Sequence, residues 1–304
     1  MKKVLFFLFS AALLLFAAGC DKDPQDNIPV FPDPATKDQA VSILFNKGEV
    51  LQLELPERIY GNGTMTAGSP VKVSIPQIDL SEANRYILYI GNKTVWTGRY
   101  TYDSKNKLYS LEDVGTIELK EASCIVTPVK VRAALDGPVE VPATIIPLWK
   151  AATSVVMNNL SRTWKVASTY ITVDGGKNNV SFSKGFNGCD FHEIGKYCKD
   201  MKVSLSDDDL ASLQGYKVQE FMLEGNNSII ITFDSKDPYY GSYTANGNSF
   251  HWNLNDSNIL LSATAVGAVS FPGNGVAELV MNSHISAGSE KYTATITMTL
   301  EPVY

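Results

Sequence analysis

Histidine and cysteine are scarce in this sequence of 304 residues, which contains three histidines and four cysteines. The histidines His192, His251 and His284 are too scattered to predict a Ser-His-acid constellation. The sequence also contains no Gly-x-Ser-x-Gly elbow, no phosphate-binding loop and no H-E-x-x-H helix. Paired glycosidase carboxylates leave no local signature, so a hydrolase remains an alternative. We expect a protein that is not an enzyme and that holds no cofactor or metal.

Basic residues are outnumbered by acidic ones, with 26 lysines and arginines against 32 aspartates and glutamates. The formal net charge is −6, and no stretch of the chain is strongly basic. An acidic surface repels phosphate backbones and anionic lipid headgroups. The composition therefore predicts that nucleic acid is not a partner.

Long apolar runs are absent apart from one, which extends from Val4 to Ala18. This run has roughly 15 residues, whereas about 20 are needed to span a bilayer. Lys2 and Lys3 precede it, and small residues end it. A basic start, an apolar stretch and small residues before a cleavage point are typical of a secretory signal peptide, which we place at residues 1–19.

The junction Ala17-Ala18-Gly19-Cys20 resembles the lipobox of bacterial lipoproteins, in which leucine is more usual at the first position. The resemblance implies that Cys20 is lipidated and becomes the new N-terminus. Diacylglycerol and an amide-linked acyl chain such as palmitate together give stable membrane attachment. We therefore expect a lipid-anchored protein of the cell envelope, at the outer membrane, on either its periplasmic or its surface face.

Residues 20–39 are rich in proline and acidic residues and poor in apolar ones. Such a segment cannot form a core and is typical of a disordered tether. Asp21 and Asp23 loosely match the acidic residues that follow the lipidated cysteine in surface lipoproteins of one Gram-negative lineage. The tether would hold a folded body away from the membrane.

Three cysteines remain besides Cys20: Cys124, Cys189 and Cys198. The envelope permits disulfides and Cys189 lies close to Cys198 in the sequence, so we predict a disulfide between them. A metal site is the alternative because His192 and Glu193 lie between the two thiols, although the spacing is not that of a CxxC zinc site. Cys124 is predicted to be a buried strand residue without a partner.

Residues 40–147 contain short strand patterns separated by turn signals. Apolar and polar residues alternate in LQLEL from Leu51 and in VKVSI from Val71, which is the two-residue period of a half-buried strand. The stretch GRYTYDSKNKLYSL from Gly98 predicts a hairpin with a polar turn. Many short antiparallel strands with frequent turns predict a β-sandwich domain over residues 40–147.

Helical signal is limited to two places. Apolar residues recur at spacings of three and four from Pro147 to Leu160, which predicts a helical segment that joins the two halves. Ser206 followed by Asp207-Asp208-Asp209 predicts a capped helix start. Cation binding by these aspartates is the alternative, but no D-x-D-x-D-G loop is present.

Strand patterns return in residues 148–304 and are clearest in KYTATITMTLEPV near the C-terminus. Roughly eight strands in about 140 residues is the size of a small closed antiparallel barrel. The chain is therefore predicted to be all-β, with a sandwich followed by a barrel.

The phrase Leu160-Ser161-Arg162-Thr163-Trp164-Lys165 resembles the Leu-x-x-x-Trp-Lys opening of lipocalin-like domains in bacterial lipoproteins. Arg162 stands where that family commonly has glycine. The resemblance implies a lipocalin-like barrel over residues 148–304, with Trp164 closing one end. It also implies a cavity for a small apolar molecule, and an interior filled by side chains is the alternative.

Aromatic residues gather around one predicted hairpin of the barrel, at Tyr239, Tyr240, Tyr243 and Trp252. These side chains either belong to the barrel core or form a platform for a sugar or lipid at the barrel mouth. We predict a membrane-anchored, non-enzymatic binding module for a small apolar or sugar ligand. The alternative is a scaffold that docks on another envelope protein.

Overall fold

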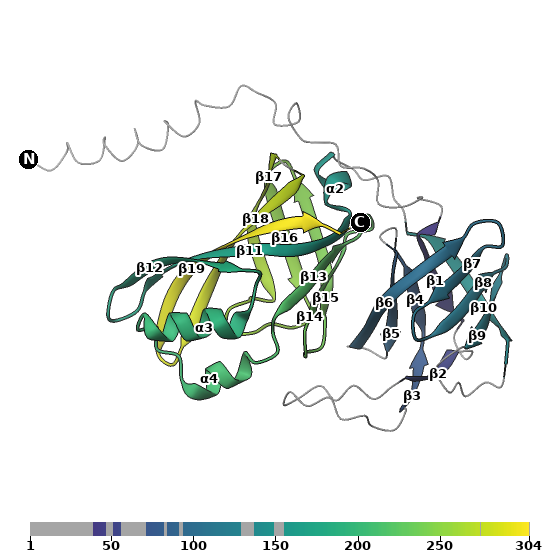
Figure 1. The fold of residues 1–304 in the computed structure, drawn as a ribbon, viewed down its shortest axis with the longest axis horizontal. Coiled ribbons are helices and arrows are strands. Elements are labelled where there is room, and N and C mark those ends of the chain that lie inside the picture. Colours follow the sequence, from purple (N-terminus) through teal and green to yellow (C-terminus); the bar gives the residue numbers. More distant parts are fainter. Residues whose placement is uncertain are drawn as a thin grey trace, which may run out of the picture.

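The computed structural model describes most of the chain from residue 39 onward, namely residues 39–46, 51–55, 71–81, 84–90, 94–128, 137–148, 155–273 and 275–303. These residues form two closed antiparallel β-barrels that lie side by side (Figure 1). The predicted all-β class is confirmed. Residues 1–19 and the lipidation site Cys20 lie outside the described residues, as does nearly all of the predicted tether.

The first barrel contains eight strands: β1 (Val41–Phe45), β4 (Gln77–Leu80), β5 (Arg85–Ile90), β6 (Thr94–Asp103), β7 (Leu108–Leu111), β8 (Gly115–Leu119), β9 (Ser123–Pro128) and β10 (Val139–Pro147). A separate hairpin pairs β2 (Leu51–Leu55) with β3 (Val71–Ile75). Each barrel strand pairs with the next in sequence, apart from β1, which pairs with β4 and β10.

The first barrel is closed, which corrects the predicted N-terminal sandwich. A sandwich leaves edge strands in two sheets, whereas β1 bonds to a neighbour on both sides and so removes the edges. β10 pairs with β9 through Val139–Pro142 and with β1 through Ala143–Pro147. Pro142 therefore lies where the strand changes partner, which is a position that tolerates a missing N–H donor.

The second barrel begins with β11 (Arg162–Gly175) and closes when that strand pairs with β19 (Glu290–Pro302). Between them follow β13 (Val218–Leu223), β14 (Ser228–Phe233), β15 (Tyr239–Asn246), β16 (Ser249–Leu254), β17 (Thr264–Gly273) and β18 (Val276–Ala287). β12 (Val180–Asn187) extends the sheet beyond β11. The division of the chain into independently folding domains at residue 147 stays a prediction.

Three short helices accompany the second barrel: α2 (Val155–Leu160), α3 (Phe191–Asp200) and α4 (Asp207–Ser212). α2 confirms the end of the predicted joining helix. α4 confirms the predicted cap, since Ser206 and Asp209 form a reciprocal capping box. None of the helices in the described residues has the length and hydropathy of a membrane span.

Trp164 is fully buried close to α2, as the lipocalin resemblance implies. Its indole N–H donates to the carbonyl of Leu160 over 2.9 Å. The guanidinium of Arg162 lies over the ring, 5.7 Å from its centroid. Arg162 thus covers the tryptophan from the position where the family commonly has glycine.

Candidate functional site

The two barrels meet through an apolar cluster that belongs to neither barrel core. Ile87 and Val95 from the first barrel pack there with Met222 and Ile230 from the second. These side chains point outward from their barrels, because their strand neighbours point into the two cores. We call this contact the joint. In Figure 1 it lies between β5 and β6 on one side and β13 to β15 on the other.

An ion pair crosses the joint at its edge. Arg85 donates from Nε to Oε2 of Glu220 over 3.0 Å, and its Nη2 donates to Oε1 of the same carboxylate. The Arg85 side chain is 8% exposed and that of Glu220 is 22% exposed. A bidentate pair fixes the orientation of both groups, so it holds the barrels in one arrangement.

A buried carboxylate reinforces the first-barrel side of the joint. Asp79 accepts hydrogen bonds from Gln77 Nε2 at 2.9 Å and from the Tyr89 hydroxyl at 3.0 Å, and also from Ser42. Burial, followed by the charge of Asp79, raises the pKa of Tyr89. The Tyr89 hydroxyl therefore stays a donor, and the carboxylate is satisfied by hydrogen bonds.

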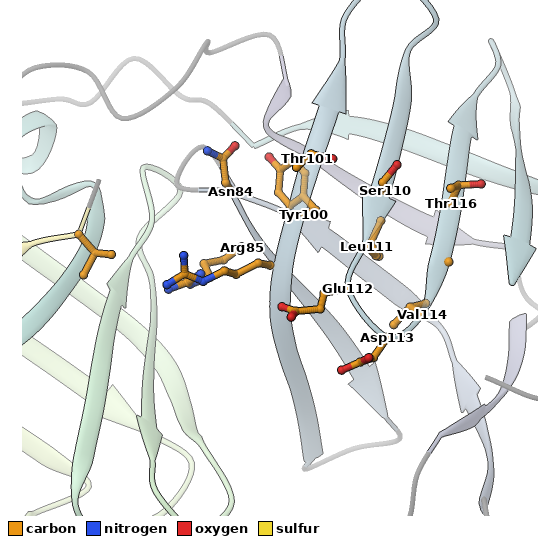
Figure 2. Close-up of a pocket in the computed structure, with 13 residues that line it drawn as sticks. Asn84, Arg85, Tyr100, Thr101, Ser110, Leu111, Glu112, Asp113, Val114 and Thr116 are labelled. Carbon is orange, nitrogen blue, oxygen red and sulfur yellow. The ribbon is translucent and has the colours of Figure 1, made fainter. Parts of the chain in front are cut away.

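Beside the joint lies an open cleft of about 720 Å³, drawn in Figure 2. Its walls come from β5, β6, β7 and β8 and the turns next to them, and Val303 is its contribution from the second barrel. The N–H of Val303 donates to the carbonyl of Thr163, which anchors the C-terminal segment at this position. The cleft therefore belongs to the first barrel, with one lining residue from the second.

The floor of the cleft is a grid of polar side chains on the outer face of the first barrel. One row contains Arg85 opposite Arg99, followed by Glu112, whose N–H donates to the Arg99 carbonyl over 2.9 Å. The second row contains three hydroxyl residues in cross-strand register, Thr101, Ser110 and Thr116 (Figure 2). We call these six residues the polar grid.

Strand alternation explains why the grid faces outward. Tyr100, Leu111 and Ile117 point into the first barrel core, so their neighbours along each strand point to solvent. At the β7–β8 turn, Gly115 has a φ of +135°. A Cβ there would lie 2.3 Å from the Thr127 carbonyl oxygen, so this turn requires glycine.

The charges of the cleft are of both signs. Arg99 is exposed and makes no ion pair with a described residue. Glu112 and Asp113 are exposed beside it. Guanidinium donors, carboxylate acceptors and hydroxyls therefore lie within one concave surface, a combination suited to a polar ligand.

The aromatic residues predicted as a ligand platform are placed elsewhere. Tyr239, Tyr243 and Trp252 are at most 2% exposed and belong to the second barrel core. The Tyr243 ring stacks on Phe250 with centroids 5.7 Å apart. Tyr240 packs in the joint instead. Three of these side chains therefore belong to the barrel core, which was the alternative to a platform, and the fourth contacts the other barrel. Their part in ligand binding stays a prediction.

The predicted disulfide is corrected as well, since Cys189 and Cys198 are both free and buried. Cys198 lies inside helix α3 and Cys189 precedes the helix. A rise of about 1.5 Å per residue carries Cys198 roughly 10 Å along the helix from Phe191, which exceeds the roughly 7 Å that a disulfide allows. Burial raises the pKa of each thiol to about 12. Cys124 is free and buried on β9, as predicted.

The alternative metal site between these cysteines is not formed by the described residues. No group of three or more metal-binding side chains converges there. The Nδ1 atom of His192 lies 2.9 Å from the carbonyl oxygen of Leu210. This contact uses the imidazole to join α3 to α4.

Sequence reasoning missed the joint and the cleft, although a signal for the joint was present. β5 begins with four consecutive buried residues, Arg85–Leu88, and β14 contains three consecutive isoleucines, Ile229–Ile231, all buried. A strand buried on both faces has an unbroken apolar run instead of alternation. In both strands the outer face is covered by the other barrel.

No protein-family model matches the sequence, and no curated protein does. Two similar solved structures are mutants of the vaccine antigen transferrin-binding protein B from Haemophilus parasuis Hp5, both 11% identical, with TM-scores of 0.24 and 0.25. They align with 83% and 84% of this chain, which spans 60% and 59% of theirs. A third is a "putative outer membrane protein" from Bacteroides fragilis NCTC 9343, 12% identical, with a TM-score of 0.25 and coverage of 83% of this chain and 98% of that one. Likenesses of this strength decide neither fold nor function here.

Proposed function

We propose that this chain is a lipid-anchored, non-enzymatic binding module of the bacterial cell envelope, and that the cleft beside the joint binds a saccharide. The Ala17-Ala18-Gly19-Cys20 junction supports the anchor. The polar grid inside a cleft of about 720 Å³ is the observation that carries the binding proposal.

The chemistry of the grid suits a polyhydroxylated ligand. Each sugar hydroxyl both donates and accepts a hydrogen bond, so its site needs donors and acceptors side by side. Arg99 supplies donors, Glu112 supplies acceptors and Ser110 supplies either. The volume lies within the range of about 300–1,000 Å³ that small-molecule sites occupy. A short oligosaccharide therefore fits both the chemistry and the size.

A small apolar ligand has less support from the described residues. The second barrel, which the lipocalin resemblance made the candidate for an apolar cavity, contains a large aromatic core instead. Phe221, Phe250 and Trp252 stack or meet edge to face inside it. These rings occupy space that an apolar ligand would need.

Hydrolysis of the saccharide is not part of the proposal. Glycosidases place two carboxyl groups on opposite sides of the scissile bond. Glu112 and Asp113 are consecutive residues of one turn, so both approach a ligand from the same side. This arrangement can hold hydroxyl groups but does not bracket a glycosidic bond.

The test begins with an oligosaccharide array probed with the mature protein lacking its lipid, and the best neutral binder is then titrated by calorimetry. The double variant Ser110→Ala, Glu112→Ala is expected to bind about ten-fold more weakly, because it loses two hydrogen-bonding groups. The matched control is Thr172→Ala, Ser183→Ala, which removes an exposed cross-strand hydroxyl pair from the second barrel. The proposal fails if no oligosaccharide binds, or if the two double variants weaken binding equally.

A further inference from the structure

Arg85 belongs to the floor of the cleft, yet its guanidinium is engaged by the other barrel. Both its Nε and its Nη2 donate to the two carboxylate oxygens of Glu220. We propose that Glu220, a residue outside the cleft, sets the charge selectivity of the cleft by neutralising Arg85. The identity of the natural ligand rests on the function proposed above, whereas the selectivity itself is a property of the charges.

The neutralisation of Arg85 matters because a second arginine, Arg99, lies beside it. Arg85 and Arg99 are directly opposite on β5 and β6, and like charges in that position repel each other. Glu220 compensates one of the two. The cleft is then left with the exposed cation of Arg99 against the carboxylates of Glu112 and Asp113. Such a balance admits neutral or cationic hydroxylated ligands and disfavours anionic ones.

A β-bulge aims Glu220 at the first barrel. The pairing of β13 with β14 shifts register between Val218 and Glu220. Val218 and Phe221 both point into the second barrel core, so two residues occupy the outward position between them. The Glu220 N–H donates to the Thr232 hydroxyl over 3.1 Å, which fixes the backbone of the bulge. The second barrel therefore presents this carboxylate in a defined direction.

Burial of the Arg85–Glu220 ion pair strengthens the influence of Glu220 on the charge of the cleft. The Arg85 side chain is almost completely shielded from solvent, and Glu220 is largely shielded. Charges in such a place are screened by salt much less than exposed ones. Loss of the Glu220 carboxylate would leave the Arg85 guanidinium uncompensated beside that of Arg99, and two adjacent guanidinium groups can bind an anion.

The experiment uses inorganic sulfate as the probe, so that it does not depend on a saccharide ligand. Sulfate is titrated into the mature protein lacking its lipid while the amide signals of Thr101 and Ser110 are followed by NMR. Glu220→Ala is expected to bind sulfate at least about ten-fold more tightly than the unmodified protein, because charge-assisted hydrogen bonds to Arg85 become available. Asp208→Ala removes an equal charge from the exposed part of α4 and is expected to leave sulfate binding unchanged.

Two further variants show whether a gain in sulfate affinity comes from the freed Arg85 charge or from loosening of the joint. Arg85→Ala, Glu220→Ala is expected to lose the gained affinity. The exchange Arg85→Glu, Glu220→Arg retains an ion pair across the joint and is expected to show no gain. If Glu220→Ala does not fold, Glu220→Gln removes the charge at nearly constant volume.

The inference is overturned if neither Glu220 variant binds sulfate more tightly, or if the gain persists without Arg85. Failure of the proposed function has a different signature. No oligosaccharide would then bind to the unmodified protein, while the sulfate response of Glu220→Ala would remain.

Discussion

Tyr89 of the first barrel and Tyr240 of the second meet edge to face, with ring centroids 6.4 Å apart and planes at 88°. Edge-to-face contact is a favoured geometry for aromatic pairs. Together with the Arg85–Glu220 ion pair, it orients the two barrels relative to each other. The position of Val303 at the cleft depends on that orientation.

Loss of this aromatic contact should weaken the joint. Tyr240→Ala removes the ring pair and part of the apolar cover, so the free energy of unfolding should fall by about 1–2 kcal/mol. Urea unfolding of the mature protein measures it. Tyr170→Ala is the control, because Tyr170 is 51% exposed on the same barrel, and its effect should stay within about 0.5 kcal/mol. Equal losses for the two variants would show that Tyr240 contributes no more than a surface tyrosine.

The aromatic core of the second barrel should prove structural. Trp252 is 2% exposed and packs between Phe221 and Phe250. Trp252→Ala should lower the free energy of unfolding by about 3–5 kcal/mol through the cavity that it creates. Saccharide affinity of the fraction that remains folded should be unchanged. If the variant is stable but binds saccharide more weakly, Trp252 contacts the ligand and the structural interpretation is wrong.

All three cysteines of the folded body should be present as free thiols. Burial raises the pKa of Cys124, Cys189 and Cys198 to about 12, so almost no thiolate exists near pH 8. Ellman's reagent should label them only after denaturation. Peptide mapping under non-reducing conditions is the complementary measurement, and a peptide that links Cys189 to Cys198 would contradict the helical separation of the two residues.

Lipidation of Cys20 should decide whether the protein stays at the membrane. Cys20→Ala should block lipidation, so the protein should leave the membrane fraction or accumulate with its signal peptide attached. Intact-mass measurement of the unmodified protein should show an acylated N-terminus at residue 20. A mature start elsewhere, or an unmodified Cys20, would remove the anchor from the account.

Local patterns in the sequence predicted individual elements well. The strand predicted at VKVSI coincides with β3, Val71–Ile75, and the predicted cap at Ser206 is present. Both depend on residues within a few positions of each other. Helix α3 was not predicted, because the segment between Cys189 and Cys198 was interpreted as a disulfide loop. A helix signal is present there, since Asp190 caps the helix and Phe191, Ile194 and Cys198 lie on one buried face.

Closure of the first barrel and the presence of the cleft could not be predicted from local patterns, because both depend on residues that are far apart in the sequence. Barrel closure needs β1 to pair with β10, whose residues lie about 100 positions later. Arg85 and Glu220 are separated by 135 positions. An arginine in a predicted strand gives no indication of which face it occupies or which barrel neutralises it. Such pairings arise from packing of whole barrels, which periodicity does not report.

Amide hydrogen exchange, with and without the best-binding neutral oligosaccharide, tests the central claim most directly. If the cleft is the binding site, exchange should slow at residues 99–101 of β6 and residues 110–116 around the β7–β8 turn. It should not slow around the aromatic hairpin of residues 239–254 in the second barrel. Protection confined to that hairpin, or the absence of any ligand-dependent protection in the first barrel, would contradict the account.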